Sequence, residues 1–342
     1  METASQTQAD VSPQIIIDTL TAFQQTAALQ AAIELGLFGA VGETAGDVAS
    51  LARHCSASER AARILCDSMT ILGLLKKEDG RYRHSPASAV FLDPRSPACL
   101  ASTARFLNNP TMNDAFQHLA ETARAGKTTL PGGGSVEPEN PIWVEFARSM
   151  APMFGPLAAP LAAIALEGLS GPVRVLDIAA GHGLFGIAVA KQNPQARIVA
   201  VDWPAVLGVA QENARHAGVE DRYERLPGSA FEVGFGGPFD IALLTNFLHH
   251  FDAPTCVALL KKVRASMKPG GRVATLEFVP NEDRVSPPAV AQFSLIMLAT
   301  TPAGDAYTFR ELEAMYHEAG LERVTQHALP LNPESAVVGY AL

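Results

Sequence analysis

The 342-residue chain is long enough for two domains, and its 48% hydrophobic and 18% charged composition is typical of a soluble globular protein. Its formal net charge of -9 disfavours a polyanionic partner such as DNA. No uninterrupted apolar run reaches membrane-spanning length, and the polar segment 1–12 lacks the order of a signal peptide. The four cysteines stand far apart, without metal-ligand spacing. We therefore expect a cytoplasmic protein with reduced thiols, no membrane partner and no metal site.

The first predicted element is a long helix with an apolar stripe. Ser12 and Pro13 form its start signal, a hydroxyl cap followed by proline, and Gly36 ends it. The stripe consists of Ile16, Leu20, Phe23, Ala27, Ala31 and Leu35. An apolar surface of this length needs a partner, and both its own domain and a second subunit can provide one.

Residues 46–84 have the pattern of two helices followed by a β-hairpin. Residues 46–54 form the first helix, a capping box at 56–59 opens the second, and Asp79-Gly80 turns a hairpin over 74–84. This order is the winged-helix arrangement, which occurs in DNA-binding proteins. Because the chain is acidic and the second helix has few basic residues, we expect a structural use, with DNA binding as the weaker alternative.

A strand, a glycine turn and an apolar helix are predicted over 173–190, which is the opening of a nucleotide-type binding unit. Gly181, Gly183 and Gly186 fit the spacing G-x-G-x-x-G, which alone would suggest a dinucleotide and an oxidoreductase. Asp177, however, ends the strand where a pyrophosphate would lie, and a carboxylate there repels phosphate. It favours a cationic ligand without phosphate, and S-adenosylmethionine fits, with its ammonium and sulfonium groups. A helix-capping or solvated carboxylate is the structural alternative for Asp177.

About twenty residues further on, Asp202 ends a second predicted strand, and its carboxylate can accept both ribose hydroxyls of a nucleoside. Strands and helices then alternate, which predicts a parallel sheet with helices on both faces. The further strands are expected at 223–226, 239–245, 272–279, 323–329 and 336–340, and the helices at 204–217, 255–267 and 310–318, the last capped by Thr308. Ligands of such sheets gather at the carboxyl ends of the strands. The residues expected to converge there are Asp177, Asp202, Gly228, Ser229, Thr245, Asn246 and Glu277.

Two apolar helical segments can border that edge of the sheet. One follows a Gly/Pro-rich loop predicted over 126–140, and the other lies within 287–301. Apolar residues at helical spacing are usually core, but they can also form a pliable wall for a flat substrate. The candidate substrate-binding residues are Trp143, Phe146, Met150, Met153, Phe293 and Met297. Arg148 lies among them and either reaches solvent or pairs with a carboxylate, for which S-adenosylmethionine is a candidate.

Taken together, these motifs resemble the S-adenosylmethionine-dependent O-methyltransferases of the plant caffeate and bacterial polyketide and phenazine type. The resemblance covers nearly the whole chain, and residues 301–308 are similar to a bacterial branch. Its specific marks are Val175-Leu176-Asp177-Ile178 before Gly181-His182-Gly183, then Val201-Asp202-Trp203-Pro204, and Leu248-His249-His250-Phe251 after the fourth strand. It implies an α/β fold, a Rossmann-like class I methyltransferase sheet with an N-terminal, mostly α-helical winged-helix dimerisation domain. The implied division is a dimerisation domain over 1–100, a helical linker contributing to the substrate pocket over 101–165, and a cofactor-binding catalytic domain over 166–342.

The resemblance also implies roles for individual residues. In the family, the histidine that matches His249 takes the proton from a phenol while the oxygen attacks the methyl group, and the acidic residue that matches Glu277 orients the imidazole. This chemistry is sensible because phenoxide is the better nucleophile and imidazole titrates near neutral pH. His250 stands where the family commonly has an acidic residue, so either imidazole can face the substrate. The implied cofactor-binding set is Arg148, Asp177, Gly181, Gly183, Asp202, Trp203, Gly228, Ser229, Ala230, Thr245 and Asn246.

Three positions depart from the family pattern. A second orienting glutamate of the plant enzymes falls at about Ala306, which cannot orient an imidazole. The aspartate that usually reads the adenine amino group appears as Ser229. Trp203 replaces a common leucine and can stack on adenine, which would offset some of that loss.

The sequence thus predicts a homodimeric enzyme that methylates a hydroxyl of a small aromatic secondary metabolite, with His249 as base. A carbon or nitrogen methyltransferase of the same fold is the nearest alternative. A second alternative is a relative that uses S-adenosylmethionine without methyl transfer, for decarboxylation, hydroxylation or rearrangement. An NAD oxidoreductase and a DNA-binding regulator are the remaining possibilities.

Overall fold

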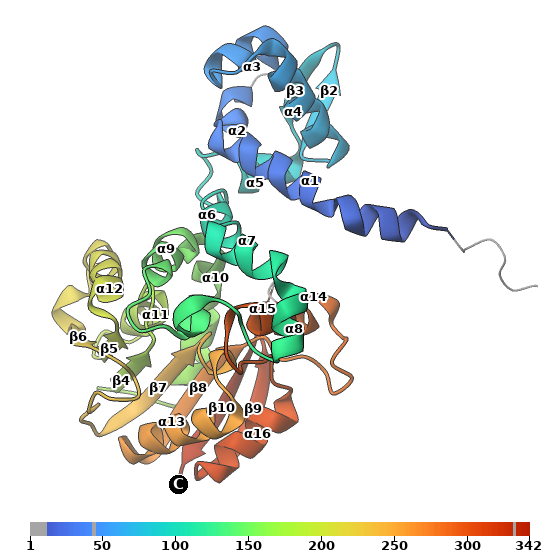
Figure 1. The fold of residues 1–342 in the computed structure, drawn as a ribbon. Coiled ribbons are helices and arrows are strands. Elements are labelled where there is room, and N and C mark those ends of the chain that lie inside the picture. Colours follow the sequence, from blue (N-terminus) through green and yellow to red (C-terminus); the bar gives the residue numbers. More distant parts are fainter. Residues whose placement is uncertain (1–11, 43–45, 331–332) are drawn as a thin grey trace, which may run out of the picture. The chain divides into compact units, whose positions relative to one another are not determined.

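The structure of the protein is a computed structural model that describes residues 12–42, 46–330 and 333–342 (Figure 1). It divides the chain into two compact units, Met1–Ala104 and Arg105–Leu342. The segment 1–11, which carries most of the argument against a signal peptide, lies outside the described residues. The division into three parts, with a separate helical linker over 101–165, stays a prediction.

The first unit has the predicted winged-helix order. Helices α3 (Val48–His54) and α4 (Glu59–Ile71) precede the antiparallel hairpin of β2 (Leu75–Glu78) and β3 (Arg81–His84). Two details of the prediction were wrong. Residues 46 and 47 form the short strand β1 (Gly46–Asp47) beside β3, so α3 begins only at Val48, capped by Asp47. Helix α4 is capped by Ser58 rather than Ser56, because Ser56 takes a left-handed conformation with φ 51° that ends the preceding turn.

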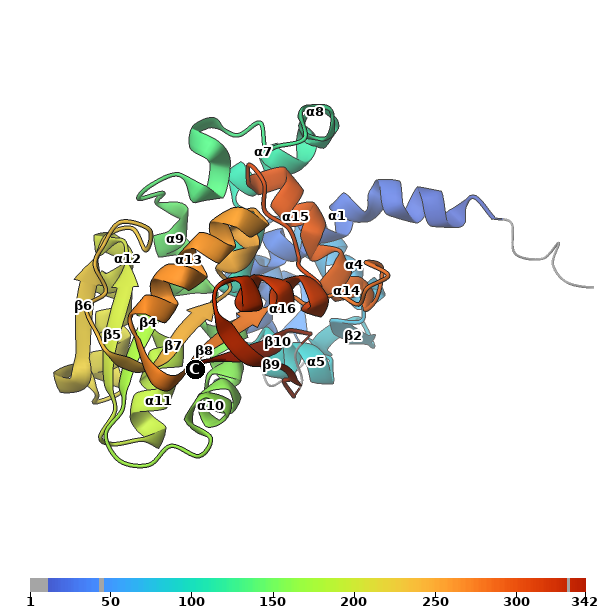
Figure 2. The same cartoon turned by 90° about the horizontal axis from the view of Figure 1, so that it is seen from below.

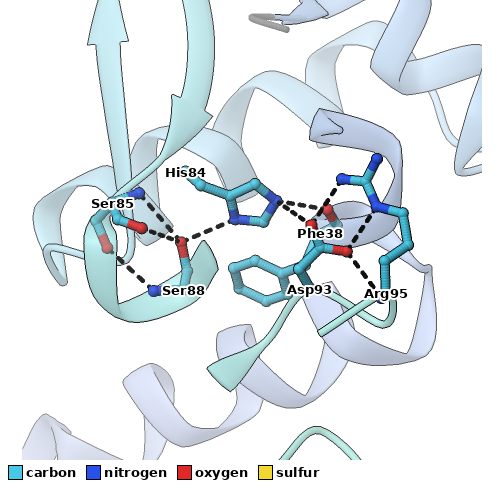
Figure 3. A network of polar contacts seen from close by, with 6 residues as sticks. All are labelled: Phe38, His84, Ser85, Ser88, Asp93 and Arg95. Carbon is cyan, nitrogen blue, oxygen red and sulfur yellow. Dashed lines mark hydrogen bonds and ion pairs between the residues drawn. The ribbon is translucent and has the colours of Figure 1, made fainter. Parts of the chain in front are cut away.

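A buried histidine ties the hairpin to two helices of this unit, α2 (Leu37–Val41) and α5 (Pro86–Phe91) (Figure 3). The Nδ1 atom of His84 lies 2.9 Å from Ser88 Oγ, and its Nε2 atom lies 2.9 Å from the carbonyl oxygen of Phe38. Beside them, Arg95 donates to Asp93 through Nε and Nη2 at 2.9 and 2.6 Å. These bonds satisfy polar groups that burial would otherwise leave without partners.

The long N-terminal helix α1 (Gln14–Glu34) begins one residue later than predicted, and the Gln14 N–H bonds to Ser12 Oγ at 3.2 Å. Its C-terminal half packs into the core of the first unit through Ala28, Leu29, Ala32 and Ile33. Its N-terminal half exposes Ile15, Ile16, Ile17, Leu20 and Phe23, with exposed fractions of 48 to 75%. An apolar face of this extent is typical of a protein interface.

The second unit begins with helices that lead to the sheet. They are α7 (Pro110–Gln117), α8 (Leu119–Ala125), the short turn η1 (Pro131–Val136), α9 (Ile142–Ser149) and α10 (Ala151–Leu166), while α6 (Thr103–Leu107) spans the boundary between the units. The predicted loop over 126–140 contains only η1, in which Gly132, Gly133 and Gly134 have positive φ. The helix predicted to run through residues 143–154 is instead two helices bent by 69°. The break lies at Met150, just before Pro152, whose ring and missing N–H disfavour continuation of α9.

A seven-stranded sheet forms the core of the second unit, with the order β6-β5-β4-β7-β8-β10-β9. The first five strands in that order are parallel, and β10 runs antiparallel to both β8 and β9. The strands are β4 (Arg174–Ile178), β5 (Arg197–Asp202), β6 (Tyr223–Pro227), β7 (Phe239–Thr245), β8 (Met267–Glu277), β9 (Leu321–Ala328) and β10 (Ser335–Ala341). The predicted α/β fold with a Rossmann-like sheet is confirmed.

Helices cover both faces of this sheet, as the alternation of strands and helices predicts. They are α11 (Leu184–Gln192), α12 (Pro204–His216), α13 (Ala253–Ala265) and α16 (Phe309–Glu318). Figure 2 shows α13 and α16 on one face and α10 and α11 on the other. Val175 of β4 belongs to the core under α10 and α11, whereas its neighbour Leu176 belongs to the opposite core, because successive side chains of a strand point to opposite faces.

The apolar segment before α16 forms two short helices, α14 (Pro288–Ala291) and α15 (Phe293–Thr300), where one was predicted. Within the described ranges, no single helix is long and apolar enough to cross a membrane. The pair α9 and α10 reaches the required length and composition only when taken together across its 69° bend.

Candidate active site

The carboxyl ends of the parallel strands bring most of the predicted site residues to one edge of the sheet. Asp202, Thr245 and Glu277 are the last residues of β5, β7 and β8. Gly228 follows β6 directly, and its N–H donates to the Asp202 carbonyl oxygen at 2.9 Å. The predicted convergence at this edge is what the strand order and register produce.

The glycine turn after β4 lies against Asp202. Gly181 and Gly183 have φ of 56° and 74°, values that glycine adopts without the strain of a side chain. The Gly181 N–H donates to Asp202 Oδ2 at 2.8 Å, and the Trp203 N–H donates to Oδ1 at 2.7 Å. Burial raises the pKa of Asp202 to about 6, although these two hydrogen bonds oppose the shift. Each oxygen keeps a lone pair with which it can accept from a ligand hydroxyl.

Asp177 takes the helix-capping position that the sequence left as an alternative. Its side chain is fully buried, and Oδ2 accepts from the N–H of Gly186, the third residue of α11, at 3.1 Å. The alternation of side chains along β4 turns Asp177 toward the face that α11 covers. A β-carbon on Gly186 would lie 2.6 Å from Asp177 Oδ2, so the helix approaches this closely only because that residue is glycine.

Two buried acidic groups, Asp177 and Asp202, lie at this edge of the sheet. Burial raises the pKa of Asp177 well above its ordinary value, and the nearby charge of Asp202 adds to the shift. Oδ1 of Asp177 is buried without a hydrogen-bond partner among the described residues. Among the described residues, no cationic side chain forms an ion pair with Asp177 or Asp202. A cationic ligand with hydroxyl groups, such as S-adenosylmethionine, fits such a site.

The other predicted cofactor residues lie around this edge in less direct positions. Arg148 forms a half-exposed ion pair with Glu212 of α12, at 3.3 Å between Nη1 and Oε2. Trp203 precedes α12 and packs with Trp143 on Ala147 of α9. The remaining three are Ser229, Ala230 and Asn246. Ser229 Oγ accepts from the Phe231 N–H at 3.2 Å, the Ala230 carbonyl oxygen accepts from Lys262 at 2.9 Å, and the Asn246 N–H donates to the Leu276 carbonyl oxygen at 2.8 Å.

His249 and Glu277 form a buried hydrogen-bonded pair. His249 lies in the short turn η3 (Leu248–His250) after β7, and its Nδ1 is 2.5 Å from Glu277 Oε2. Glu277 Oε1 accepts from the N–H groups of Phe247 and Leu248 at 3.1 and 2.9 Å. These bonds fix the carboxylate, which in turn fixes the ring. Because a carboxylate accepts, Nδ1 carries the hydrogen, and Nε2 is left as the basic nitrogen of the neutral ring.

His250 has a different environment from its neighbour. Its Nδ1 is 3.3 Å from Ser135 Oγ of η1, and Trp143 meets its ring edge-on at 5.1 Å between centroids. Burial lowers the pKa of His250 well below its ordinary value, and the adjacent His249 adds to the shift. The ring is therefore neutral at physiological pH, and no carboxylate orients it in the described structure. Ser135 is a contact that the sequence did not reveal, because it lies in a glycine-rich loop far away in the chain.

Aromatic side chains surround the two histidines. Phe293 meets the His249 ring edge-on at 4.8 Å and stacks on Phe278 at 4.0 Å. Phe146 contacts both Trp143 and Phe106, at 5.7 and 5.0 Å between ring centroids. The predicted Trp143, Phe146 and Phe293 thus gather near the site, together with Phe106 and Phe278, which were missed. Of the predicted methionines, Met150 and Met297 are almost fully buried, and Met153 packs against the core beside Met150.

Comparisons with known proteins agree with this geometry. Residues 153–322 match the O-methyltransferase domain, and residues 17–94 match the O-methyltransferase dimerisation domain. The chain is 28% identical to 3-hydroxy-5-methyl-1-naphthoate 3-O-methyltransferase of Streptomyces sahachiroi, over 91% of this chain and 90% of that protein. It is 29% identical to acetylserotonin O-methyltransferase of Mus musculus, over 90% of this chain and 84% of that protein.

Solved structures show the same likeness. A protein from Nostoc punctiforme, named provisionally as an O-methyltransferase, is 44% identical with a TM-score of 0.94, over 96% of this chain and 99% of that chain. Human N-acetylserotonin methyltransferase, solved in complex with S-adenosylmethionine, has a TM-score of 0.82 at 22% identity, over 99% of both chains, which supports the fold. The chain therefore belongs to the O-methyltransferase family, enzymes of the secondary-metabolite type that carry a dimerisation domain and use S-adenosylmethionine as methyl donor.

Proposed function

We propose that this enzyme methylates a hydroxyl group of a small aromatic acceptor, with His249 as general base. The observation that carries the proposal is the buried pair of His249 and Glu277 at the carboxyl end of β8. S-adenosylmethionine, when bound, supplies an electrophilic methyl group on a sulfonium ion. The residues of this chain then have three tasks: to hold that cofactor, to hold the acceptor, and to remove the hydroxyl proton.

His249 is suited to the proton transfer because its two ring nitrogens are differentiated. Nδ1–H donates to Glu277, so Nε2 can accept the proton of a phenol held within hydrogen-bond reach. The imidazolium that forms is stabilised by the adjacent carboxylate, which two backbone N–H groups keep in place. The phenol can thereby lose its proton to His249 at neutral pH, and no free phenoxide has to form in water.

The cofactor would be held by the edge of the sheet. Asp202 offers carboxylate oxygens to ribose hydroxyls, and Gly181 and Gly228 leave room for close approach of a ligand to the backbone. The carboxylate of Asp202, ionised above about pH 6, suits the positive charge of the sulfonium and ammonium groups. We assign Arg148 to the cofactor carboxylate, for which it would have to exchange its exposed ion pair with Glu212.

The acceptor would lie among Trp143, Phe146 and Phe293, whose rings offer flat apolar surfaces. The names of the relatives support an aromatic acceptor, because they specify a hydroxynaphthoate and acetylserotonin. We include in this proposal a cytoplasmic location and a homodimer, since the chain carries a dimerisation domain and α1 exposes an apolar face.

The test is His249→Ala, assayed with a hydroxynaphthoate and with S-adenosylmethionine carrying a deuterated methyl group. We expect turnover to fall by about a thousandfold, while S-adenosylhomocysteine binding by calorimetry stays unchanged. His216→Ala, an exposed histidine at the end of α12, is the matched control and should behave as the wild type. Wild-type methylation by His249→Ala would refute the general-base role. Label found on carbon or nitrogen, or cofactor consumed without label transfer, would instead favour the alternative reactions of this fold.

A further inference from the structure

Glu334 is a buried carboxyl group near the His249 and Glu277 pair, and the proposed reaction does not use it. Only 1% of its surface is exposed. The next residue, Ser335, begins β10 and pairs with Glu277 of β8 in the antiparallel register. Burial raises the pKa of Glu334 to about 8, and the neighbouring charge of Glu277 adds to the shift. Two carboxyl groups therefore lie together at the carboxyl end of β8.

The surroundings determine which of the two carboxyl groups carries a proton. Glu277 accepts from the N–H groups of Phe247 and Leu248 and from His249, so both of its oxygens serve as acceptors. A second buried negative charge beside it would be repelled and poorly solvated. Glu334 is thus the group that stays neutral at physiological pH.

The Asn246 side chain provides a partner that matches a neutral carboxylic acid. It lies within reach of the Glu334 side chain. Its Oδ1 atom is buried without a donor in the part of the chain that the structure describes. A protonated Glu334 can accept from the Asn246 amide N–H and donate its O–H to Oδ1, whereas an ionised Glu334 can only accept.

Asn246 in turn shapes the segment that carries His249. It follows the last residue of β7 in a left-handed conformation with φ 54°, and its backbone N–H donates to the Leu276 carbonyl oxygen at 2.8 Å. The next two residues, Phe247 and Leu248, supply the N–H groups that bind Glu277. Any change in the orientation of Asn246 is therefore passed to the turn η3 and to the imidazole.

We propose that Glu334 is a positioning residue: in its protonated form it pairs with the Asn246 amide and so holds the turn that presents His249. This inference rests on the proposed function of His249 as base. Deprotonation of Glu334 removes the O–H donor and places a second charge beside Glu277, which loosens the turn. The other titratable groups around Glu277 are His249, Cys256 and Tyr316, and burial raises the pKa of both Cys256 and Tyr316 far above this range.

The pH dependence of turnover separates this role from a merely structural one. We expect wild-type kcat to fall above about pH 8. Glu334→Ala should lower kcat by about tenfold at every pH. Glu334→Gln, whose amide both donates and accepts but cannot ionise, should recover most of that loss at pH 7 and show no fall above pH 8. Glu318→Gln, on an exposed residue of α16 that pairs with Lys261, is the control and should follow the wild type.

Infrared spectroscopy supplies a second readout that does not depend on catalysis. At pH 7 the spectrum of the wild type minus that of Glu334→Gln should show the C=O stretch of a buried protonated carboxyl group, whereas the wild type minus Glu318→Gln should lack it, because the contribution of the buried Asp177 cancels in both differences. The proposal is overturned if that band is missing. It is also overturned if the kcat of Glu334→Gln still falls above pH 8, or if its kcat at pH 7 is as low as that of Glu334→Ala. Should His249→Ala retain full activity, the proposed function fails instead, and the band still reports whether Glu334 is protonated.

Discussion

Gly304 packs directly against the backbone of His249. A β-carbon at this position would lie 2.2 Å from the His249 carbonyl oxygen and 2.9 Å from the carbonyl carbon of His250. The segment 301–308 therefore lies against the turn η3, and only glycine fits at position 304.

Gly304→Ala should displace His249 and lower kcat by about a hundredfold, because a shift of about 1 Å suffices to misalign a proton acceptor. Cofactor affinity should change little, since the glycine turn after β4 is not touched. The matched control is Gly234→Ala, where the added carbon meets no atom within 4 Å. Steady-state kinetics on both variants tests this, and equal kcat values for them would contradict the steric argument.

Cofactor binding should depend on pH through Asp202. Burial raises the pKa of this carboxyl to about 6, and its ionised oxygens are the proposed acceptors for ribose hydroxyls. Affinity for S-adenosylhomocysteine should be full above pH 6 and weaken by up to about tenfold per pH unit below it, as protonation removes an acceptor. Calorimetry from pH 5 to pH 8 should show this slope in the wild type and in the exposed control Asp221→Asn. Asp202→Asn should bind more weakly and without the slope, and a retained slope would assign the proton to another group.

The capping of α11 by Asp177 should contribute to stability. Gly186→Ala would place a carbon 2.6 Å from Asp177 Oδ2 and 2.8 Å from Ile198 Cγ2, so the helix must shift and the cap must lengthen. We expect the free energy of unfolding to fall by about 1–3 kcal/mol in urea denaturation. Gly208→Ala in α12 has open space around the added carbon and should raise the free energy of unfolding by up to about 1 kcal/mol. A gain of similar size in both variants would mean that helix propensity, and not the contact with Asp177, governs the effect.

The exposed half of α1 should govern association of the chain. Phe23 is 67% exposed although it is a large aromatic side chain, and Leu20 and Ile16 extend the same apolar face. Phe23→Asp should shift the protein from dimer to monomer in sedimentation velocity, because a carboxylate in an apolar interface is poorly solvated. Gln24→Asp adds the same charge at the neighbouring exposed position and should leave the dimer intact. A dimeric Phe23→Asp would place the interface elsewhere.

Local patterns predicted the sheet and the winged-helix unit. The pairing of His249 with Glu277 was implied by the resemblance to the O-methyltransferases. The errors have local causes that periodicity does not encode. The helix through Met150 breaks because Pro152 disfavours continuation, and Ser56 fails to cap because its backbone is left-handed. For Asp177 the sequence left a ligand-facing and a helix-capping carboxylate open, and Oδ2 caps α11, while a role toward the cofactor stays a prediction.

No pattern in the sequence indicated which distant loops would be in contact. Ser135 reaches His250 from a glycine-rich segment, and Glu334 reaches Asn246 from the connection before β10. Neither residue belongs to a motif or to a periodic element. Such contacts depend on tertiary packing, which single-chain patterns do not specify.

The reversed direction of β10 has a consequence for how this enzyme can diversify. A parallel strand at that place would begin at the far edge of the sheet, but the antiparallel one begins beside Glu277, with Ser335 opposite it. Glu334, which directly precedes β10, thereby lies near the proposed reaction centre although it belongs to neither the glycine motif nor the histidine motif. Substitutions in the short connection before β10 can retune the proton affinity of the centre while the cofactor loop and the base stay untouched.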